Sequence, residues 1–234
     1  MKPYYDRDGI TIYHGDCREI LPHVKADCVV TSPPYAEQRK GIYESIAETE
    51  YPKFTSDWMT AASNGCGGSF FINIREHVHL GIMSDYVHRT RIGLRDAGWN
   101  EHDELIWVKP DSAPLGDPNR PRRSWERILW FSMGNPRCFP KQAGSPRVNV
   151  TGGVMSKATD DWSATHSTSR DIPRSGTGMA RTPDYRVQSI GERAGGIVHP
   201  ARFPTGLARW IVLLGSSAGS TILDPFMGSG TTLV

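Results

Sequence analysis

The chain has 234 residues, a formal net charge of +2 and four cysteines that lie far apart. This length supports one sizeable hydrophobic core. The cysteines form no CxxC pair, which argues against a zinc framework and against the dense pairing of a small secreted domain. No apolar run approaches the roughly 18 residues of a membrane span, and the N-terminus is too polar for a signal peptide. We therefore expect a soluble, cytoplasmic protein.

The charge is distributed unevenly along the chain. Residues 1–119 contain 12 Lys and Arg against 18 Asp and Glu, whereas residues 120–223 contain 15 against 6. Thirteen of those fifteen cations are arginine, a side chain suited to bidentate contacts with phosphates and guanine edges. The asymmetry is typical of a nucleic-acid-binding stretch, although a solvated basic surface would give the same counts.

The first half of the chain alternates strand-like and helix-like segments. The expected strands run continuously apolar or alternate, and the expected helices have apolar residues at helical spacing. The predicted strands are 10–14, 27–31, 68–74 and 104–109, and the predicted helices are 18–23, 51–62 and 80–97. This order favours an α/β fold with a largely parallel sheet and helices on both faces.

From residue 110 onward Pro, Gly, Ser and Arg dominate, interrupted by a predicted strand at 128–132. Residues 134–198 have almost no periodicity, and a loop of that length in a compact domain is either a functional insertion or disordered. Regular structure resumes with a predicted helix at 204–214 and a strand at 221–223. We therefore divide the chain into a first catalytic part, 1–133, an insertion, 134–198, and a second part, 199–234.

The last predicted strand ends in a glycine-rich turn, DPFMGSGTT, at residues 224–232. Glycines let the backbone approach a ligand closely, and the start of the next helix offers free amide donors. A Walker loop needs a lysine that is absent here, and a dinucleotide motif needs a glycine where Leu233 stands. A plain β-turn would leave the Asp-Pro-Phe segment unexplained. The turn is therefore predicted to bind a cofactor.

Residues 31–35 read TSPPY and follow a predicted buried strand. The two prolines present carbonyl oxygens without competing amides, Ser32 offers a hydroxyl, and the flat ring of Tyr35 can stack on a base. An acceptor pair beside a ring suits an exposed exocyclic amino group. A Pro-Pro turn by itself is common and mostly structural, so this motif becomes informative only together with its partners.

Together, residues 31–35 and 224–232 resemble the amino methyltransferases of DNA, in their permuted beta group, where the catalytic motif precedes the cofactor motif. Residues 199–204 (HPARFP) are similar to the family segment that lines the methionine end of the cofactor, and residues 15–17 (GDC) to the one on its adenine side. The resemblance covers residues 10–132 and 199–232. It implies a Rossmann-like sheet that binds S-adenosylmethionine.

The resemblance also implies roles for individual residues. The expected catalytic residues are Ser32, Pro33, Pro34 and Tyr35. The expected cofactor-binding residues are Asp16, His199, Phe203, Pro204, Asp224, Phe226, Gly228, Gly230 and Thr231. Residues 134–198 stand where the family has its target-recognition region, which implies a surface for double-stranded DNA. The expected DNA contacts there are Arg137, Arg147, Arg174 and Arg186.

The serine of the catalytic motif bears on the target base. In this family SPPY is similar to the cytosine N4 enzymes and DPPY to most adenine N6 enzymes, with exceptions, so we favour cytosine N4 and keep adenine N6 as the alternative. Enzymes that methylate RNA or a protein glutamine use NPPY, and Ser32 argues against them. No cysteine follows a proline, which argues against ring-carbon methylation through a thiolate.

Two further expectations concern the end of the chain and isolated side chains. The family continues past the glycine turn into a strand whose acidic residue holds the ribose, whereas this chain ends at Val234. We expect a truncated product, with a strand supplied by another chain, a reduced pocket, or a catalytically impaired DNA-binding remnant as alternatives. His77 and His79 are typical of surface or capping positions, so no metal site is expected. Trp58 and Glu126 are expected to serve packing and capping.

Overall fold

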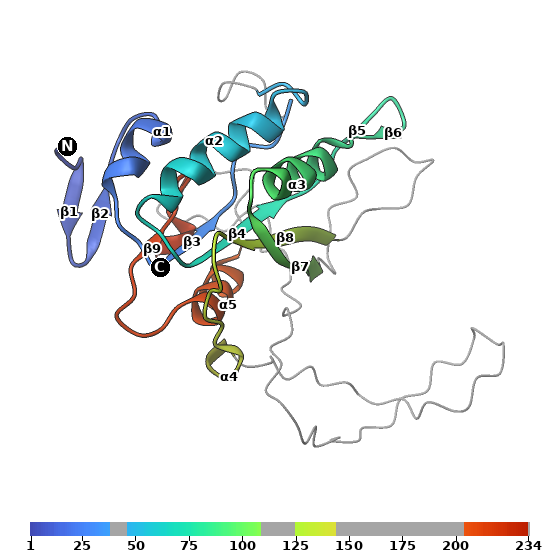
Figure 1. Ribbon diagram of the computed structural model, residues 1–234. Helices are drawn as coiled ribbons and strands as arrows, with labels where there is room; N and C mark the ends of the chain where they lie inside the picture. The colour runs from blue at the N-terminus through green and yellow to red at the C-terminus, as the bar shows by residue number, and fades with distance from the viewer. Residues whose placement is uncertain (38–45, 109–124, 144–203, 234) are drawn as a thin grey trace, which may run out of the picture.

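The computed structural model describes residues 1–37, 46–108, 125–143 and 204–233. A five-stranded sheet forms the centre of the molecule (Figure 1). Its strands are, in spatial order, β7 (Asn100–Val108), β8 (Trp125–Ser132), β4 (Ser69–Ile74), β3 (Cys28–Thr31) and β9 (Ile222–Leu223). β3 pairs in parallel with both β4 and β9, whereas β8 runs antiparallel to β4 and β7. The prediction of a largely parallel sheet is confirmed, with β8 as the reversed strand.

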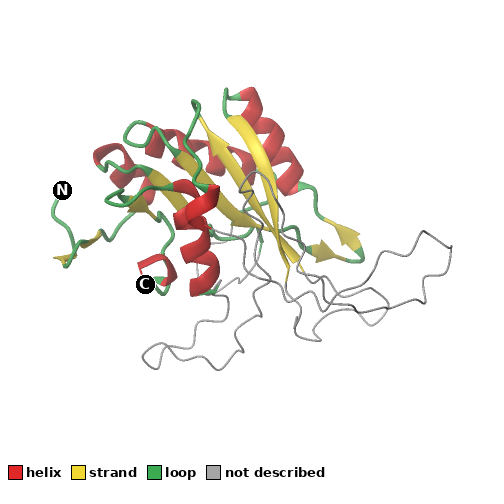
Figure 2. Ribbon diagram, turned by 90° about the horizontal axis from the view of Figure 1, so that it is seen from below, coloured by secondary structure: helices red, strands yellow, loops and turns green. Residues whose placement is uncertain are grey.

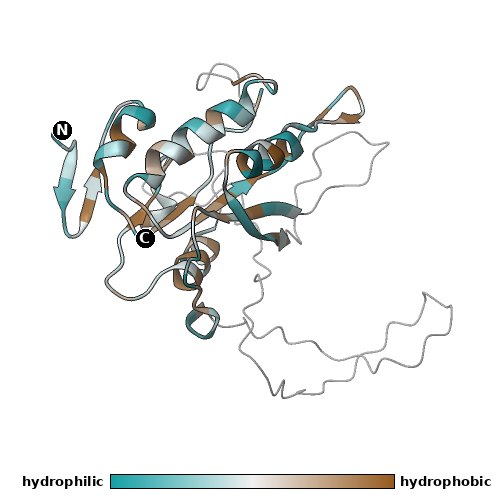
Figure 3. Ribbon diagram, viewed as in Figure 1, coloured by the Kyte–Doolittle hydropathy of each residue, from teal (hydrophilic) through white to brown (hydrophobic). Residues whose placement is uncertain are grey.

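Helices cover both faces of this sheet, as the sequence predicts (Figures 1 and 2). One face carries α1 (Cys17–Ile20), the 3-10 turn η1 (Leu21–His23), α2 (Tyr51–Ser63) and α3 (Tyr86–Asp96). The other face carries α4 (Pro140–Ala143) and α5 (Thr205–Gly215). The glycine-rich turn after β9 ends in a short 3-10 helix, η2 (Thr231–Leu233). α2 and α3 each carry both hydrophilic and hydrophobic residues, whereas α5 is largely hydrophobic (Figure 3).

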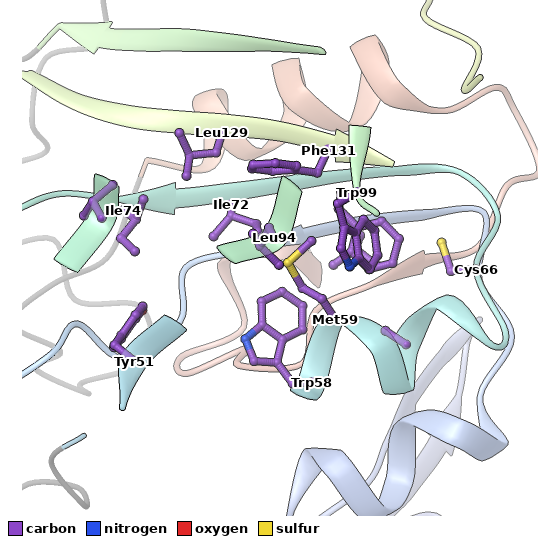
Figure 4. Close-up of a cluster of buried hydrophobic side chains, with 14 of the residues drawn as sticks. Tyr51, Trp58, Met59, Cys66, Ile72, Ile74, Leu94, Trp99, Leu129 and Phe131 are labelled. Atoms are coloured by element: carbon purple, nitrogen blue, oxygen red, sulfur yellow. The ribbon is translucent and has the colours of Figure 1, made fainter. Parts of the chain in front are cut away.

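The alternation of side chains along the strands divides the core into two layers. Val29 of β3 packs in the layer under α2 and α3, whereas its neighbours Cys28 and Val30 pack in the layer against α5. Figure 4 shows the first layer, in which Trp58 and Met59 of α2 lie against the sheet. Both side chains are fully buried. The expectation that Trp58 serves packing is confirmed.

The predicted strand at 10–14 does not join the main sheet. In the described residues, β2 (Ile10–Ile12) pairs only with β1 (Tyr5–Arg7), in an antiparallel hairpin of its own at the side of the molecule (Figure 1). The turn between them is Asp8-Gly9, and both residues have positive φ, 53° and 78°. An Asp-Gly pair between two strands is a strong hairpin signal, because both turn residues must adopt φ above zero.

The prediction of one helix over residues 80–97 is wrong for its first turn and a half. β5 (Val78–His79) and β6 (Ile82–Met83) form a second small hairpin, and α3 begins only at Tyr86. Leu80 and Gly81 form the turn of this hairpin, with φ of 49° and 78°. The helical spacing of apolar residues therefore begins after a Gly-containing turn that breaks the helix.

The first ten residues of the predicted insertion lie against the body of the molecule. Phe139 donates its backbone N–H to the carbonyl of Leu214 at 2.7 Å, and Gln142 donates to the carbonyl of Ser216 at 2.9 Å. Residues 144–198, the rest of that segment, lie outside the described residues. In the part of the chain that is described, no helix is long and apolar enough to cross a bilayer.

Candidate active site

The catalytic motif and the glycine-rich turn leave the sheet side by side. β3 and β9 are parallel neighbours, so their carboxyl ends, Thr31 and Leu223, lie at the same edge. The chain after β3 leads to α2 on one face of the sheet, and the turn after β9 ends in η2, which contacts α5 on the other face. Adjacent parallel strands whose connections diverge in this way open a crevice at their carboxyl ends, which is where open α/β sheets bind ligands.

A hydrogen bond joins the two motifs directly. The hydroxyl of Thr31, the last residue of β3, donates to Oδ1 of Asp224 at 2.6 Å. The hydroxyl of Thr232 donates to Oδ2 of the same carboxylate at 2.6 Å, and the backbone N–H of Phe226 donates to Oδ1 at 3.0 Å. Asp224 therefore closes the glycine turn on itself and fastens it to the start of the catalytic segment.

The pKa of Asp224 reflects two opposing influences. Burial at the junction of the two strands raises it above its ordinary value, and the hydrogen bonds from Thr232, Thr31 and Phe226 act in the other direction. The net direction is upward, so desolvation outweighs the hydrogen bonds.

The glycine turn has the backbone that a closely approaching ligand requires. Gly228 and Gly230 have φ of 52° and 80°, in the left-handed region that side-chain-bearing residues rarely adopt. Gly228 is exposed at the surface of the turn. An exposed backbone of this kind, at the carboxyl end of a parallel strand and beside the catalytic segment, fits the part of a nucleoside cofactor that binds main chain. The residues present therefore fit S-adenosylmethionine.

Phe226 packs on α2. Its ring lies 5.4 Å from that of Trp58, in an edge-to-face arrangement, and 5.9 Å from that of Phe54. The side chain is partly buried against the first core layer. Phe226 thus anchors the glycine turn to the helix that follows the catalytic segment, and its partly buried ring remains a candidate wall for the cofactor.

The catalytic segment is held by a polar cluster below it. Tyr35 donates its hydroxyl hydrogen to Oε2 of Glu126 at 3.0 Å, and Asn73 donates to the Tyr35 hydroxyl oxygen at 2.9 Å. The remaining amide hydrogen of Asn73 reaches the same Glu126 oxygen at 2.9 Å. Asn73 is 3% exposed and Glu126 is 5% exposed, so the cluster lies inside the protein.

Burial also dominates the titration of Tyr35. It raises the pKa of the phenol well above its ordinary value, and the nearby charge of Glu126 raises it further. The Ser32 hydroxyl, which lies close to the Tyr35 hydroxyl, and the charge of Arg75 act in the lowering direction but do not prevail. Tyr35 therefore stays neutral and remains a hydrogen-bond donor.

The other predicted cofactor residues differ in their burial and in the contacts they make. Asp16 is exposed, caps α1 by accepting from the backbone N–H of Arg18 at 2.9 Å, and pairs with the Arg18 guanidinium, which lowers its pKa. Pro204 is buried at the start of α5, and Thr231 is buried at the start of η2. His199 and Phe203 lie outside the described residues.

The predicted DNA contacts fall mostly outside the description as well. Arg147, Arg174 and Arg186 belong to residues 144–203, which are not described. Arg137 is exposed and follows β8, the reversed strand. Because Phe131 of β8 pairs with Phe70 near the start of β4, the end of β8 lies at the edge opposite to the catalytic segment. Arg137 therefore comes from the far edge of the sheet, and its contact with DNA stays a prediction.

Three potential metal ligands do gather in the described residues. Glu37, Glu48 and His77 place ligand atoms within 4.8 Å of one another. Nε2 of His77 lies 2.8 Å from Oε1 of Glu48, a contact that a hydrogen bond explains without an ion. The expectation of no metal site stays a prediction.

Sequence reasoning missed four residues that organise this site. Thr31 and Thr232 belong to the two motifs but were given no role of their own, because threonine is ordinary next to a strand or turn. Asn73 carried a usable signal, since a polar amide within the apolar run FFINI must find a partner when the strand is buried. The structure assigns Glu126, expected to serve packing and capping, to the polar cluster under Tyr35 instead.

A doubly covered sheet with one reversed strand, a glycine turn and a TSPPY segment at adjacent strand ends defines the class of Rossmann-like methyltransferases. The family model described as DNA methylase matches residues 26–234, and the chain belongs to that family. It is therefore a DNA methyltransferase.

Named relatives agree with this assignment. The chain is 27% identical to the type II methyltransferase M.ScaI of Streptomyces caespitosus, over 99% of this chain and 74% of that protein. It is 28% identical to the orphan methyltransferase M.BamHII of Bacillus amyloliquefaciens, over 93% and 79%. Among solved structures, the cytosine-N4-specific PvuII DNA methyltransferase matches with a TM-score of 0.69 and 21% identity, over 99% of this chain and 79% of that one. The M1.HpyAVI complex with S-adenosylmethionine matches with a TM-score of 0.56 and 19% identity, over 94% and 83%.

Proposed function

We propose that the protein transfers a methyl group from S-adenosylmethionine to the exocyclic N4 amino group of cytosine in DNA. The observation that carries this proposal is the 2.6 Å hydrogen bond from Thr31 to Asp224. It fixes the segment suited to an amino group directly beside the turn suited to a cofactor. Donor and acceptor can therefore be bound at one edge of the sheet, which a direct transfer requires.

The cofactor would bind at the glycine turn, between Phe226 and Thr231, where the main chain at Gly228 is exposed to it and the buried Gly230 shapes the turn. When bound, S-adenosylmethionine supplies a methyl group on a positively charged sulfur, which leaves with the electron pair of the carbon–sulfur bond. Asp224 stays turned toward Thr31 and Thr232, so we assign it to shaping the turn. The similar structure of M1.HpyAVI was solved with S-adenosylmethionine, which supports the choice of this cofactor.

The catalytic segment would hold the base. Ser32 and the carbonyl oxygens of the Pro-Pro segment accept hydrogen bonds from the amino group, which directs its lone pair toward the methyl donor. Tyr35 packs its ring against the base. After transfer the amine carries one proton too many, and a serine hydroxyl is not basic enough to keep it. The proton therefore leaves to water, and no covalent enzyme intermediate forms.

The choice of cytosine over adenine rests on Ser32 in the SPPY motif. The likeness to the cytosine-N4-specific PvuII DNA methyltransferase supports the same choice. Adenine N6 remains the second candidate, since both bases present an amino group of the same chemistry. The test is incubation with labelled S-adenosylmethionine and unmethylated DNA of mixed sequence, followed by digestion to nucleosides and mass analysis. We expect N4-methyldeoxycytidine, whereas N6-methyldeoxyadenosine would overturn the choice of base.

Double-stranded DNA would bind through the arginine-rich stretch. A base inside a duplex hides its amino group, so it must be flipped out at a cost of a few kcal/mol that other contacts offset. Residues such as Arg147, Arg174 and Arg186 would supply these offsetting contacts by binding phosphates of the DNA backbone. Duplex affinity should then fall by about a hundredfold or more between about 50 and 200 mM salt. An affinity that does not change over this range would remove the stretch from the proposed DNA surface.

A further inference from the structure

A buried acid and a buried amide meet under the catalytic segment, and both come from strands other than the one that carries it. Asn73 lies in β4 and Glu126 lies in β8, whereas Tyr35 follows β3. The three side chains form a closed triangle with sides of 3.0, 2.9 and 2.9 Å. Tyr35 and Glu126 are separated by 91 positions in the sequence. Only the tertiary fold brings them together.

The hydrogens of the triangle can be placed without conflict. The two amide hydrogens of Asn73 go to the Tyr35 oxygen and to Oε2 of Glu126, and the phenol hydrogen of Tyr35 goes to the same Oε2. The Tyr35 hydroxyl is thus bound both as donor and as acceptor. Hydrogen bonds to an ionised carboxylate are about twice as strong as those between neutral groups. The end of the Tyr35 side chain is therefore fixed at one place.

A carboxylate buried to this degree needs compensation. Glu126 has a charged neighbour in Arg75, whose guanidinium lies 3.7 Å from Oε1. Burying an ionised group is unfavourable unless it is paired and hydrogen-bonded, and a hydrophobic residue would serve ordinary packing equally well. The position of the charge, directly behind the tyrosine of the catalytic motif, accounts for its burial better than packing does.

We propose that Glu126 and Asn73 are positioning residues, which hold the ring of Tyr35 where the target base must meet it. The inference rests on the proposed function, in which Tyr35 contacts the base, and it adds two residues from distant strands to the catalytic machinery. Neither residue touches the base or the cofactor. They act through the Tyr35 hydroxyl.

This path of action can be tested with a double-mutant cycle between Tyr35→Phe and Glu126→Gln. Each single variant should reduce kcat at saturating DNA and cofactor, by about tenfold for Tyr35→Phe and about threefold or more for Glu126→Gln. The double variant should be no slower than Tyr35→Phe alone, because the charge has no further route to the base once the hydroxyl is absent. Cofactor affinity should stay unchanged in all three.

A matched control separates positioning from general stability. Glu101 on β7 has a carboxylate that is 8% exposed and pairs with Arg91 at 2.6 Å, and it lies beside Phe131 at the opposite edge of the sheet. Glu101→Gln should lower the urea midpoint as Glu126→Gln does, yet leave kcat unchanged. Asn73→Leu is the second variant, and its effect should also disappear in the Tyr35→Phe background.

The outcomes distinguish this inference from the proposed function. Rate losses that multiply in the double variant, or a loss of kcat in Glu101→Gln that equals the one in Glu126→Gln, would overturn the positioning role. N4-methylcytosine from the wild type together with multiplying losses would keep the proposed function and remove the inference. N6-methyladenine from the wild type, together with losses that do not multiply, would overturn the choice of cytosine and keep the positioning role of Glu126 and Asn73.

Discussion

The segments that follow β3 and β9 lie side by side, but the protein holds them in different ways. The segment after β3 starts from a strand paired on both sides, contains two prolines, and is held from below by side chains of β4 and β8. The turn after β9 starts from a two-residue strand at the edge of the described sheet. Its shape depends on glycine backbone and on one carboxylate.

β9 is fastened to β3 at both of its ends. Ahead of the strand, the backbone N–H of Thr221 donates to Oδ2 of Asp27 at 2.7 Å. Behind it, Thr31 donates to Asp224 at 2.6 Å. Two Asp–Thr contacts thus compensate for the short ladder between the strands. The segment proposed to meet the base is therefore held mainly by side chains of other strands, and the turn proposed to meet the cofactor mainly by its own glycine backbone and Asp224.

A substitution at Gly228 should have the largest effect, because it changes the glycine backbone on which the turn after β9 depends. Its φ of 52° makes Gly228→Val unfavourable by about 1 to 2 kcal/mol, and the branched side chain would stand where backbone must approach the ligand. We expect affinity for S-adenosylmethionine to fall by about tenfold or more, as measured by titration calorimetry.

Gly219 provides the matched control for this variant. It has a φ of 83°, and a Cβ added there would meet open space. It precedes β9 and therefore lies at the amino ends of the parallel strands, away from the glycine turn. Gly219→Val should lower stability to a similar degree without changing cofactor affinity. Equal losses of affinity in both variants would mean that strain, rather than contact with the cofactor, is being measured.

Thr31→Val tests the connection between the two segments. Valine keeps the shape of this buried side chain but removes the hydrogen bond to Asp224, a change expected to lower stability by about 1 to 3 kcal/mol. Methyl transfer should slow several-fold because both segments lose their common anchor. Thr55→Val is the control, since Thr55 is equally buried and its hydroxyl has no partner in the described part of the chain. It should be neutral or stabilising in urea unfolding, and a loss like that of Thr31→Val would argue against the anchor.

The smallest effect concerns the pH dependence of stability at Asp224. Burial raises the pKa of this carboxyl above 3.8 in the folded protein, so the folded state holds the proton more tightly than the unfolded chain. The corresponding stability is present below that value and is lost as the pH rises through the raised pKa. Asp224→Asn cannot titrate, so its stability relative to wild type should improve from about pH 4 to about pH 7 in urea unfolding. A constant difference across this range would contradict the desolvated environment.

The sequence predicts that both segments directly follow strands, and the structure confirms this position because each segment is local. TSPPY and the glycine turn are contiguous, and their residue types limit the backbone directly. The pairing of β2 with β1, the reversal of β8 and the β5–β6 hairpin were not predicted, since periodicity reveals neither strand direction nor partner. The cluster of Tyr35, Asn73 and Glu126 depends on contacts between three separate strands, and only the buried amide of Asn73 hinted at it.

The central claim is that the segment after β3 serves the base and the turn after β9 serves the cofactor. Ser32→Ala tests it most directly, with single-turnover methyl transfer and cofactor titration carried out on the same preparation. We expect transfer that is slower by about a hundredfold or more, with an affinity for S-adenosylmethionine within about threefold of wild type. A loss of cofactor affinity as large as the loss of transfer would contradict the division between the two segments.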